Sequence, residues 1–463
     1  MACPACRGGS VAQCRAHLGE GARHGEPAEQ VTHSPERTWL APCSDAPVRA
    51  TVAVPGSKSL TNRFLVLAAL ATEPSRIAAP LISRDTELMI AALTALGARI
   101  VPDADGALRI EPIPGPAAVA GTDPVTVDCG LAGTVMRFVP PLAAATGRRV
   151  RFDGDPQAYV RPMSTMLDAL RRLGAEVTTD SGTDALPFTV EAAGGVRGGH
   201  LDLDASATSQ FVSGLLLAAG AFDLGLELIH TGERLPSRPH IDMTLETLAD
   251  AGVHVSEPEP HRWVVEPGRP HGLQVAVEPD LSNAATFLGA ALVTRGTVTI
   301  PHWPAHTTQA GEAMRGIAEE FGATSTLSRT GLEVTGPARL RGVDLDLGDV
   351  GELTPVVAAI AACAEGTSTL RNIGHLRGHE TDRLSALATE LTKTGARVTE
   401  GPDSLIIHSP ATRGARWATY HDHRMVMAAA VLGLRVEGIE IEDVATVGKT
   451  MPEFTALWTA MLG

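Results

Sequence analysis

The amino-acid sequence predicts an α/β protein built from six α+β units of about 72 residues each. An apolar stretch of helical length, followed by an alternating strand, recurs at intervals of 70 to 78 residues, and the strands begin near Ser75, Gly147, Gly225, Gly296, Gly366 and Gly438. A glycine that ends a helix before a strand recurs in phase at Gly97, Gly174, Gly252, Gly322 and Gly395. Two markers in phase argue against chance punctuation by glycine and alanine. Units of this length suit helices that bury one face on a sheet.

The expected apolar helices, in chain order, lie at residues 65–71, 138–145, 211–222, 287–293, 356–364 and 425–434. The period is longer than that of the common solenoid repeats. Five copies of the glycine marker are visible. We expect the sixth unit to be closed by a C-terminal helix at 453–462 that returns to an N-terminal strand at 48–54.

Residues 1–46 have no helical or alternating apolar pattern, and we expect a disordered leader. Cys3 and Cys6 have the spacing of zinc ligands, and Cys14, His17 and His24 could complete a site. Since there is no second paired motif, our interpretation is that the leader holds no metal.

Composition excludes several classes of protein. There are 38 basic and 53 acidic residues, the net charge is −15, and aromatic residues make up 3% of the chain, which disfavours nucleic-acid binding. The longest apolar run, 211–222, is shorter than the ~20 residues that span a bilayer. After the leader only Cys129 and Cys363 remain, so we expect no disulfide framework and a cytoplasmic protein without membrane or nucleic-acid partners.

A polar cluster precedes each apolar helix, where free N–H groups and the helix dipole favour anions. The six clusters lie at residues 56–63, 129–137, 206–210, 280–283, 349–354 and 421–424. Several of them around one cleft would bind phosphates and carboxylates. Ordinary N-capping is the alternative, and it suffices for residues 280–283.

Lysine is rare, with three among the 38 basic residues. Lys58 and Lys449 lie in glycine-containing loops, where a compact ammonium that can release a proton suggests chemistry. Lys393 resembles a solvated helix end. Glu380 and Arg383 are about one helical turn apart, which by itself suits a surface ion pair.

These motifs together resemble the 3-phosphoshikimate 1-carboxyvinyltransferase (EPSP synthase) family. The matching segments, in family order, are Pro55-Gly56-Ser57-Lys58-Ser59 with Asn62-Arg63, Ala132-Gly133-Thr134 with Met136-Arg137, Glu380-Thr381-Asp382-Arg383, Asp422-His423-Arg424-Met425 and Lys449-Thr450. The resemblance covers roughly residues 48–462. It implies a two-domain inside-out α/β barrel of six βαβαββ units, with one domain at 57–277 and the other at 48–56 plus 278–463.

The resemblance also implies a reaction of the shikimate pathway, which leads to chorismate and aromatic amino acids. The enolpyruvyl group of phosphoenolpyruvate is transferred to the 5-hydroxyl of 3-phosphoshikimate, with release of phosphate and without a metal or other cofactor. By similarity, phosphoenolpyruvate is bound by Lys58, Gly133, Arg161, Gln210, Arg383, Arg424 and Lys449. The residues matched to 3-phosphoshikimate are Lys58, Ser59, Arg63, Thr208, Ser209, Gln210, Ser237, Glu352 and His379.

Proton transfer is implied for four of these positions. Glu352 would accept the proton of the hydroxyl, Glu380 with Lys449 would handle the proton at the methylene carbon, and Lys58 would touch both substrates. A plain ion pair is the alternative for each glutamate. We expect a monomer that binds small anions.

The chain departs from the family pattern at a few positions. His379 stands where many relatives have lysine, which puts a pH-sensitive imidazole in place of a fixed charge. Glu352 stands where many have aspartate, and Leu131 and His240 occupy positions that are often asparagine and tyrosine. Two alternatives remain. One is the sister enzyme that acts on UDP-N-acetylglucosamine; it carries a cysteine on a mobile loop, and Cys129 of this chain does not match that cysteine. The other is a non-catalytic anion-binding protein of this fold.

Overall fold

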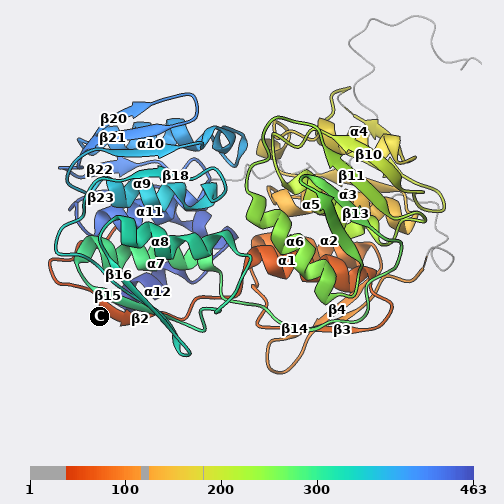
Figure 1. Ribbon diagram of the computed structural model, residues 1–463, viewed down its shortest axis with the longest axis horizontal. Helices are drawn as coiled ribbons and strands as arrows, with labels where there is room; N and C mark the ends of the chain where they lie inside the picture. The colour runs from red at the N-terminus through yellow and green to blue at the C-terminus, as the bar shows by residue number, and fades with distance from the viewer. Residues whose placement is uncertain (1–37, 116–124, 181) are drawn as a thin grey trace, which may run out of the picture. The chain divides into compact units, whose positions relative to one another are not determined.

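The computed structural model describes residues 38–115, 125–180 and 182–463, and it confirms the α/β class. The strands of these residues form six small sheets, five with four strands and one with three (Figure 1). The strands expected near Ser75, Gly147 and Gly225 begin at Ser75, Val150 and Leu226. Those expected near Gly296, Gly366 and Gly438 begin at Thr297, Ser368 and Ile439, so the sixfold repeat is confirmed.

The first three units occupy the chain up to residue 276. The first unit contains α1 (Lys58–Leu70), β3 (Ser75–Ala78), α2 (Arg84–Ala95), β4 (Arg99–Pro102), β5 (Leu108–Glu111) and β14 (Gln274–Ala276). The second contains β6 (Val125–Asp128), α3 (Gly133–Thr146), β7 (Val150–Asp153), α4 (Ser164–Arg172), β8 (Glu176–Thr179) and β9 (Phe188–Glu191). The third contains β10 (Gly199–Leu203), α5 (Gln210–Ala219), β11 (Leu226–His230), α6 (Arg238–Asp250), β12 (Val255–Glu259) and β13 (Arg262–Val265).

The other three units combine the N-terminal strands with the rest of the chain. The fourth contains β2 (Arg49–Thr51), α7 (Leu281–Thr294), β15 (Thr297–Pro301), α8 (Met314–Glu320), β16 (Thr324–Ser328) and β17 (Gly331–Thr335). The fifth contains β18 (Asp344–Asp346), α9 (Thr354–Ala361), β19 (Ser368–Arg371), α10 (Arg383–Lys393), β20 (Arg397–Glu400) and β21 (Leu405–Ser409). The sixth contains β22 (Ala415–Trp417), α11 (His423–Gly433), β23 (Ile439–Ile441), α12 (Phe454–Leu462) and β1 (Trp39–Leu40).

Each four-stranded sheet has the same pairing. In the second unit, β6 is parallel to β7 with Val125 opposite Val150, β7 is antiparallel to β9, and β9 is antiparallel to β8. The parallel pair is joined through a helix, and the antiparallel pair β8–β9 follows in sequence. This is one βαβαββ unit.

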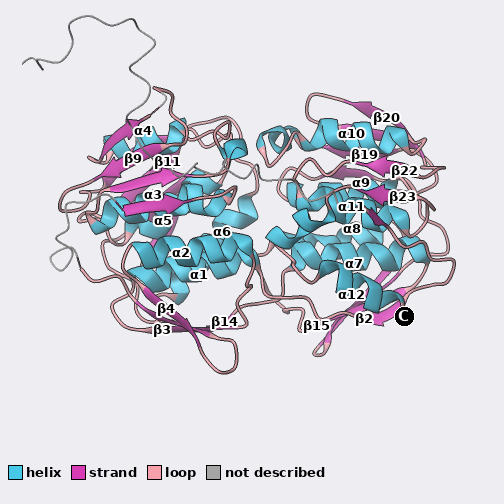
Figure 2. Cartoon of the chain, turned by 180° about the vertical axis from the view of Figure 1, so that it is seen from behind, coloured by secondary structure: helices cyan, strands magenta, loops and turns pink. Residues whose placement is uncertain are grey.

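One helix in each unit is buried on nearly all its faces. In α1, every residue from Leu60 to Leu70 is buried, and α1, α3 and α5 pack on one another with their sheets outside them (Figure 2). Helices α7, α9 and α11 pack in the same way. Two hydrophobic cores result, one drawn from Leu60 to Val277 and the other from Ala41 to Val54 and Leu281 to Met461. Each Leu or Phe that these cores remove from water contributes about 1.5–3 kcal/mol.

Each buried helix begins before its apolar stretch, because the polar cluster forms its first turn. The stretch at 65–71, for example, belongs to a helix that begins at Lys58, where the Ser57 hydroxyl accepts a hydrogen bond from the backbone N–H of Leu60. The glycines expected to end the other helices have positive φ, between 70° and 105°, at Gly97, Gly174, Gly252, Gly322 and Gly395.

The closure expected for the sixth unit is wrong in one respect. The C-terminal helix is present as α12 and packs on β2, but β2 pairs with β15 in the sheet of the fourth unit. The antiparallel strand beside β23 is instead β1, with Trp39 opposite Ile441. Parallel pairing with β15 places β2 where the other sheets have their first strand.

The expected disordered leader is therefore too long at its C-terminal end. Beyond the pairing of β1, Ala41 is buried in the second core, and its N–H donates to the carbonyl of Ile439. Two residues are too short a strand to produce an alternating pattern, which is why sequence reasoning missed β1. Cys3, Cys6, Cys14, His17 and His24 lie outside the described residues. Within the described part of the chain, no helix is long and apolar enough to cross a membrane.

Candidate active site

One pocket collects the N-terminal ends of the six buried helices α1, α3, α5, α7, α9 and α11. The predicted site residues that line it are Lys58, Ser59, Gly133, Arg161, Thr208, Ser209, Gln210, Ser237, Glu352, His379, Glu380, Arg383 and Arg424. Free N–H groups and dipole ends from several helices favour anions in such a pocket. The polar clusters of all six units thus lie at one place, as the repeat suggested.

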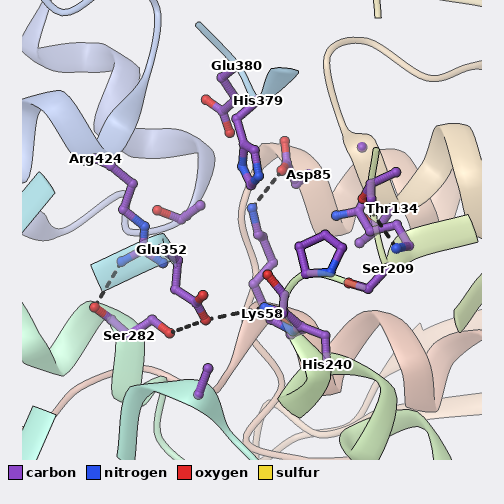
Figure 3. A pocket seen from close by; sticks show the side chains of 18 of the residues that line it. Lys58, Asp85, Thr134, Ser209, His240, Ser282, Glu352, His379, Glu380 and Arg424 are labelled. Carbon is purple, nitrogen blue, oxygen red and sulfur yellow. Dashed lines mark hydrogen bonds and ion pairs between the residues drawn. The ribbon is translucent and has the colours of Figure 1, made fainter. Parts of the chain in front are cut away.

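Lys58 projects into this pocket from the first turn of α1 (Figure 3). Its Nζ lies 3.0 Å from Oδ2 of Asp85, a nearly buried carboxylate on α2. Its backbone N–H donates to Oδ2 of Asp280, 3.1 Å away. The two carboxylates hold the lysine at the pocket wall, where its ammonium can meet an anionic ligand.

Gly133, the first residue of α3, lies beneath two guanidinium groups. A Cβ on this residue would lie 2.9 Å from Nη2 of Arg161 and 3.0 Å from Nη1 of Arg137. Arg161 is held by a hydrogen bond to the carbonyl of Leu131, and Arg137 donates to Oε1 of Gln210. Burial lowers the pKa of both arginines. A glycine here lets these side chains approach the backbone of α3.

Two further arginines enter the pocket from α10 and α11. Arg383 forms a two-point ion pair with Asp422, with distances of 2.7 Å from Nε to Oδ2 and 3.2 Å from Nη2 to Oδ1. Burial lowers the pKa of Arg383, but the pair with Asp422 outweighs it and raises the pKa overall. Arg424 donates from Nη1 to the carbonyl of Ser282, 2.9 Å away. Both guanidinium groups are thereby fixed in direction.

The carboxylate of Glu380 contacts two nitrogen-bearing side chains, those of Lys449 and His423. Its Oε2 lies 3.2 Å from Nζ of Lys449, and its carboxylate lies 3.3 Å from Nδ1 of His423. Burial raises the pKa of Glu380, but His423 and Lys449 outweigh it and hold the pKa well below its usual range. Although Lys449 does not line the pocket, this contact connects it to the pocket wall.

The same region brings two carboxylates and an imidazole together. Donor atoms of Glu380, Asp422 and His423 lie within 4.8 Å of one another, a spacing that a metal ion could use. Both carboxylates already pair with cations, Lys449 and Arg383. The donor set is therefore that of an ion-pair network, and we assign no metal to it.

Glu352 lies in η4 (Gly351–Leu353), directly before α9 (Figure 3). Its Oε1 lies 3.2 Å from Nε2 of His240 and accepts a hydrogen bond of 3.4 Å from the hydroxyl of Ser282. Burial raises the pKa of Glu352, but the charge and hydrogen bond of His240 outweigh it and lower the pKa to about 2. The side chain is a buried carboxylate at neutral pH.

Comparisons with known proteins identify the family to which the chain belongs. A family model described as EPSP synthase (3-phosphoshikimate 1-carboxyvinyltransferase) matches residues 44–458. A 3-phosphoshikimate 1-carboxyvinyltransferase of Kocuria rhizophila is 55% identical over 440 residues, which are 94% of this chain and 98% of the relative. The chain belongs to the EPSP synthase family.

Solved structures agree with the fold of this family. Two structures of EPSP synthase from Acinetobacter baumannii superpose with TM-scores of 0.75 and 0.74, at 24% and 23% identity. They cover 92% of this chain and 97% and 98% of their own. The six units thus form the two-domain inside-out α/β fold of EPSP synthases.

One departure from the EPSP synthase pattern has a clear electrostatic consequence. Nη1 of Arg383 lies 3.4 Å from Nδ1 of His379, and because a guanidinium can only donate, Nδ1 must accept. Burial, followed by the charge of Arg383, lowers the pKa of His379 well below its usual value. His379 therefore titrates below the range of an ordinary histidine, and its part in binding 3-phosphoshikimate stays a prediction.

Arg63, like Lys449, is a predicted ligand that does not line the pocket. It is buried between α1 and α6, where Nε donates to the hydroxyl of Thr244 and Nη2 to the carbonyl of His240. Burial lowers its pKa to about 9. Its role as a ligand stays a prediction.

Several pocket residues were missed by sequence reasoning. Asp85, Ser282, Gln309, His375 and His423 line the pocket beside the predicted residues. Residues 280–283 do cap α7, since Asp280 accepts from the N–H of Asn283, but Ser282 also contacts Glu352. Its signal was its place in the fourth polar cluster. Asp85 had no comparable signal, because it lies in a second helix of its unit.

Proposed function

We propose that this pocket catalyses transfer of the enolpyruvyl group of phosphoenolpyruvate to the 5-hydroxyl of 3-phosphoshikimate. Membership of the EPSP synthase family makes the chain a 3-phosphoshikimate 1-carboxyvinyltransferase. The observation that carries the residue roles is one pocket that holds fixed cations beside two ionised carboxylates. Both substrates are multiply anionic, so a protein of net charge −15 needs such a focused positive site.

Phosphoenolpyruvate is bound, in this proposal, by guanidinium groups whose directions are already fixed. Arg161, Arg383 and Arg424 suit the phosphate and carboxylate groups, because a guanidinium can donate to two oxygens at once. The backbone at Gly133, which has no Cβ, and the amide of Gln210 lie on the same side of the pocket. Lys449 is connected to this side by its ion pair with Glu380.

3-Phosphoshikimate occupies the side of the pocket built from α1, α5 and α6. The hydroxyls of Ser59, Thr208, Ser209 and Ser237 can donate to its phosphate. Lys58 lies between the two substrate sites, and its pair with Asp85 leaves other ammonium protons free for phosphate oxygens. His379 can donate only from Nε2, since its Nδ1 accepts from Arg383.

The addition step transfers one proton away from the hydroxyl and one to the methylene carbon. Oxygen of the 5-hydroxyl bonds to C2 of phosphoenolpyruvate while Glu352 accepts its proton, and the C2–C3 electron pair takes a proton from the Lys449–Glu380 pair, in which the ammonium of Lys449 carries the proton. The contact of 3.2 Å between Lys449 and Glu380 lets a proton pass between them. In the elimination step, a C3 proton returns to this pair, the C2–C3 double bond re-forms and the C2–O bond to phosphate breaks. The leaving phosphate takes the proton that Glu352 had accepted, which restores the carboxylate.

Phosphate release tests the reaction. The full-length chain should release phosphate from phosphoenolpyruvate when 3-phosphoshikimate is the acceptor and not when UDP-N-acetylglucosamine is the acceptor. Phosphate release with UDP-N-acetylglucosamine as acceptor, and none with 3-phosphoshikimate, would overturn the proposal. No release with either acceptor, from a protein that binds phosphoenolpyruvate by calorimetry, would indicate a non-catalytic anion-binding protein.

Substitution Glu352→Gln tests the base. It keeps the volume of the side chain and its hydrogen-bonding reach but removes the basic oxygen, so kcat should fall by about 10²–10⁴-fold. The dissociation constant for 3-phosphoshikimate should change far less. Glu365→Gln, at an exposed glutamate of the same unit, is the matched control and should leave kcat unchanged. Near-normal turnover of Glu352→Gln would rule out the base.

We also propose that the protein is a monomer, which light scattering measures directly. A mass of a dimer or larger would contradict this proposal.

A further inference from the structure

A histidine from one hydrophobic core holds the proposed base in the other. His240 lies in the first turn of α6, which packs in the core formed by residues 60–277, whereas Glu352 precedes α9 in the second core. The two side chains meet in the pocket, with 3.2 Å between Nε2 and Oε1 (Figure 3). The contact therefore joins side chains that are 112 positions apart in the sequence.

The contact has a defined direction. Glu352 is ionised, because its pKa is lowered to about 2, and an ionised carboxylate can only accept hydrogen bonds. The proton between the two side chains therefore belongs to Nε2 of His240. The hydroxyl of Ser282 donates to the same oxygen, Oε1, at 3.4 Å. The ion-pair contact from His240 and the hydrogen bond from Ser282 both reach Oε1 and not Oε2.

The backbone of His240 is itself held firmly. Its carbonyl lies 2.7 Å from Nη2 of the buried Arg63 and 2.9 Å from Oγ1 of Thr244. Ser237, which precedes α6, has a left-handed backbone with φ of 56°, and Pro239 follows in the first turn. These constraints fix where the imidazole begins, so a contact through its ring can fix the carboxylate.

We infer that His240 is a positioning residue for carboxyvinyl transfer: its Nε2–H holds Oε1 of Glu352, so that Oε2 is presented to the substrate hydroxyl. This inference rests on the proposed role of Glu352 as the base. A glutamate has one more rotatable bond than the aspartate of many relatives, and a donor on one oxygen removes that freedom. Proton transfer depends strongly on such alignment.

Two substitutions separate the hydrogen bond from the space that the ring fills. His240→Gln keeps an N–H donor and should retain kcat within a few-fold. His240→Leu keeps the volume but has no donor, and its kcat should fall by about ten- to hundred-fold, with a smaller change in KM for 3-phosphoshikimate. His254→Leu is the control for loss of a histidine in the same unit, because His254 is exposed and lies outside the pocket. In the full-length chain, the melting temperatures of His240→Gln and His254→Leu should stay close to wild type, whereas that of His240→Leu should fall, because a buried carboxylate loses its partner.

A double-mutant cycle with Glu352→Gln distinguishes this role from a direct one. If His240 acts through the carboxylate, then His240→Leu should lower kcat in the wild type and not in the Glu352→Gln background. An equal loss in both backgrounds would mean that His240 acts on the substrate itself and would overturn the inference. So would unchanged kcat in His240→Leu. The single variant Glu352→Gln reports separately on the base, so failure of the proposed function is recognised without the cycle.

Discussion

Glu352 illustrates how a single residue is defined by its neighbours. Burial alone would favour the protonated carboxyl, but His240 reverses that preference and lowers the pKa to about 2. The sequence placed a carboxylate at a helix N-terminus. The contact that keeps it ionised comes from a residue 112 positions earlier in the chain (352 − 240).

This lowered pKa predicts a pH dependence of stability. Because the folded pKa lies below the ordinary value of 4.5, the carboxylate stabilises the fold above about pH 4.5, and the contribution is lost as the pH falls toward 2. The difference in melting temperature between wild type and Glu352→Gln should therefore shift against the wild type between pH 5 and pH 3. Thermal unfolding at several pH values measures it, with Glu365→Gln as the exposed control. The same difference at pH 7 and pH 3 would contradict the lowered pKa.

Lys393, which was expected to be a solvated residue at a helix end, also forms an ion pair with a buried carboxylate. Its ammonium lies 2.8 Å from the carboxylate of Glu390, which is fully buried and also accepts from the hydroxyl of Tyr420. The network connects α10 to the loop before α11. Nothing in the local pattern at residues 391–395 indicated a buried partner, since Glu390 lies in an ordinary helical sequence.

Among the elements, β1 is the one that shortens the leader expected at residues 1–46. It supplies the third strand of the sixth sheet, and the ring of Trp39 packs edge-on against Phe454 of α12 at 6.3 Å. Ala41 fits against Gly433 of α11 so closely that a Cβ there would lie 2.4 Å from the Cβ of Ala41. Trp39 and Ala41 thus belong to the second core and not to a leader.

A chain that begins at Pro47 should consequently be less stable than one that begins at Thr38. It loses a strand, a half-buried tryptophan and a buried alanine, worth about 2–3 kcal/mol of apolar burial, so its melting temperature should fall by several degrees. The chain that begins at Thr38 is the control and should melt with the full-length protein. Equal melting of the two truncated chains would show that β1 adds nothing.

At the scale of the whole molecule, the chain passes between the two cores at two adjacent segments. Gly56 bridges to Pro279, the N–H of Ser57 donates to the carbonyl of Glu278, and that of Asp280 donates to the carbonyl of Pro55. The pocket has Lys58, Arg161 and Gln210 on the side of the first core, and Glu352, Arg383 and Arg424 on the side of the second. Where the two domains end, at 56/57 and 277/278, stays a prediction.

We expect these two sides to draw together around the substrates. Cations that face each other across an empty pocket repel, and a shared anion removes the repulsion. The radius of gyration from X-ray scattering should therefore decrease when phosphoenolpyruvate and 3-phosphoshikimate are both added to the Glu352→Gln variant, which binds but turns over slowly. Inorganic sulfate at the same ionic strength is the control. An unchanged radius would exclude closure.

The sequence alone determined the number of units, the buried helices, their glycine ends and the polar cluster at the start of each, because all of these are local patterns of period and composition. The six clusters followed the repeat, so their gathering in one pocket could be anticipated. Strand partners across the chain were different: β2 joins the fourth sheet and β1 the sixth, although both lie near the N-terminus. Pairing of that kind depends on which sheet edge is open in the folded protein. A strand at 48–54 was expected, but its sequence does not indicate its partner strand, and β1 is too short to show an alternating pattern. The contacts of Lys58 with Asp85 and of His240 with Glu352 were likewise decided by tertiary structure, because packing brings together side chains that no spacing in the sequence relates.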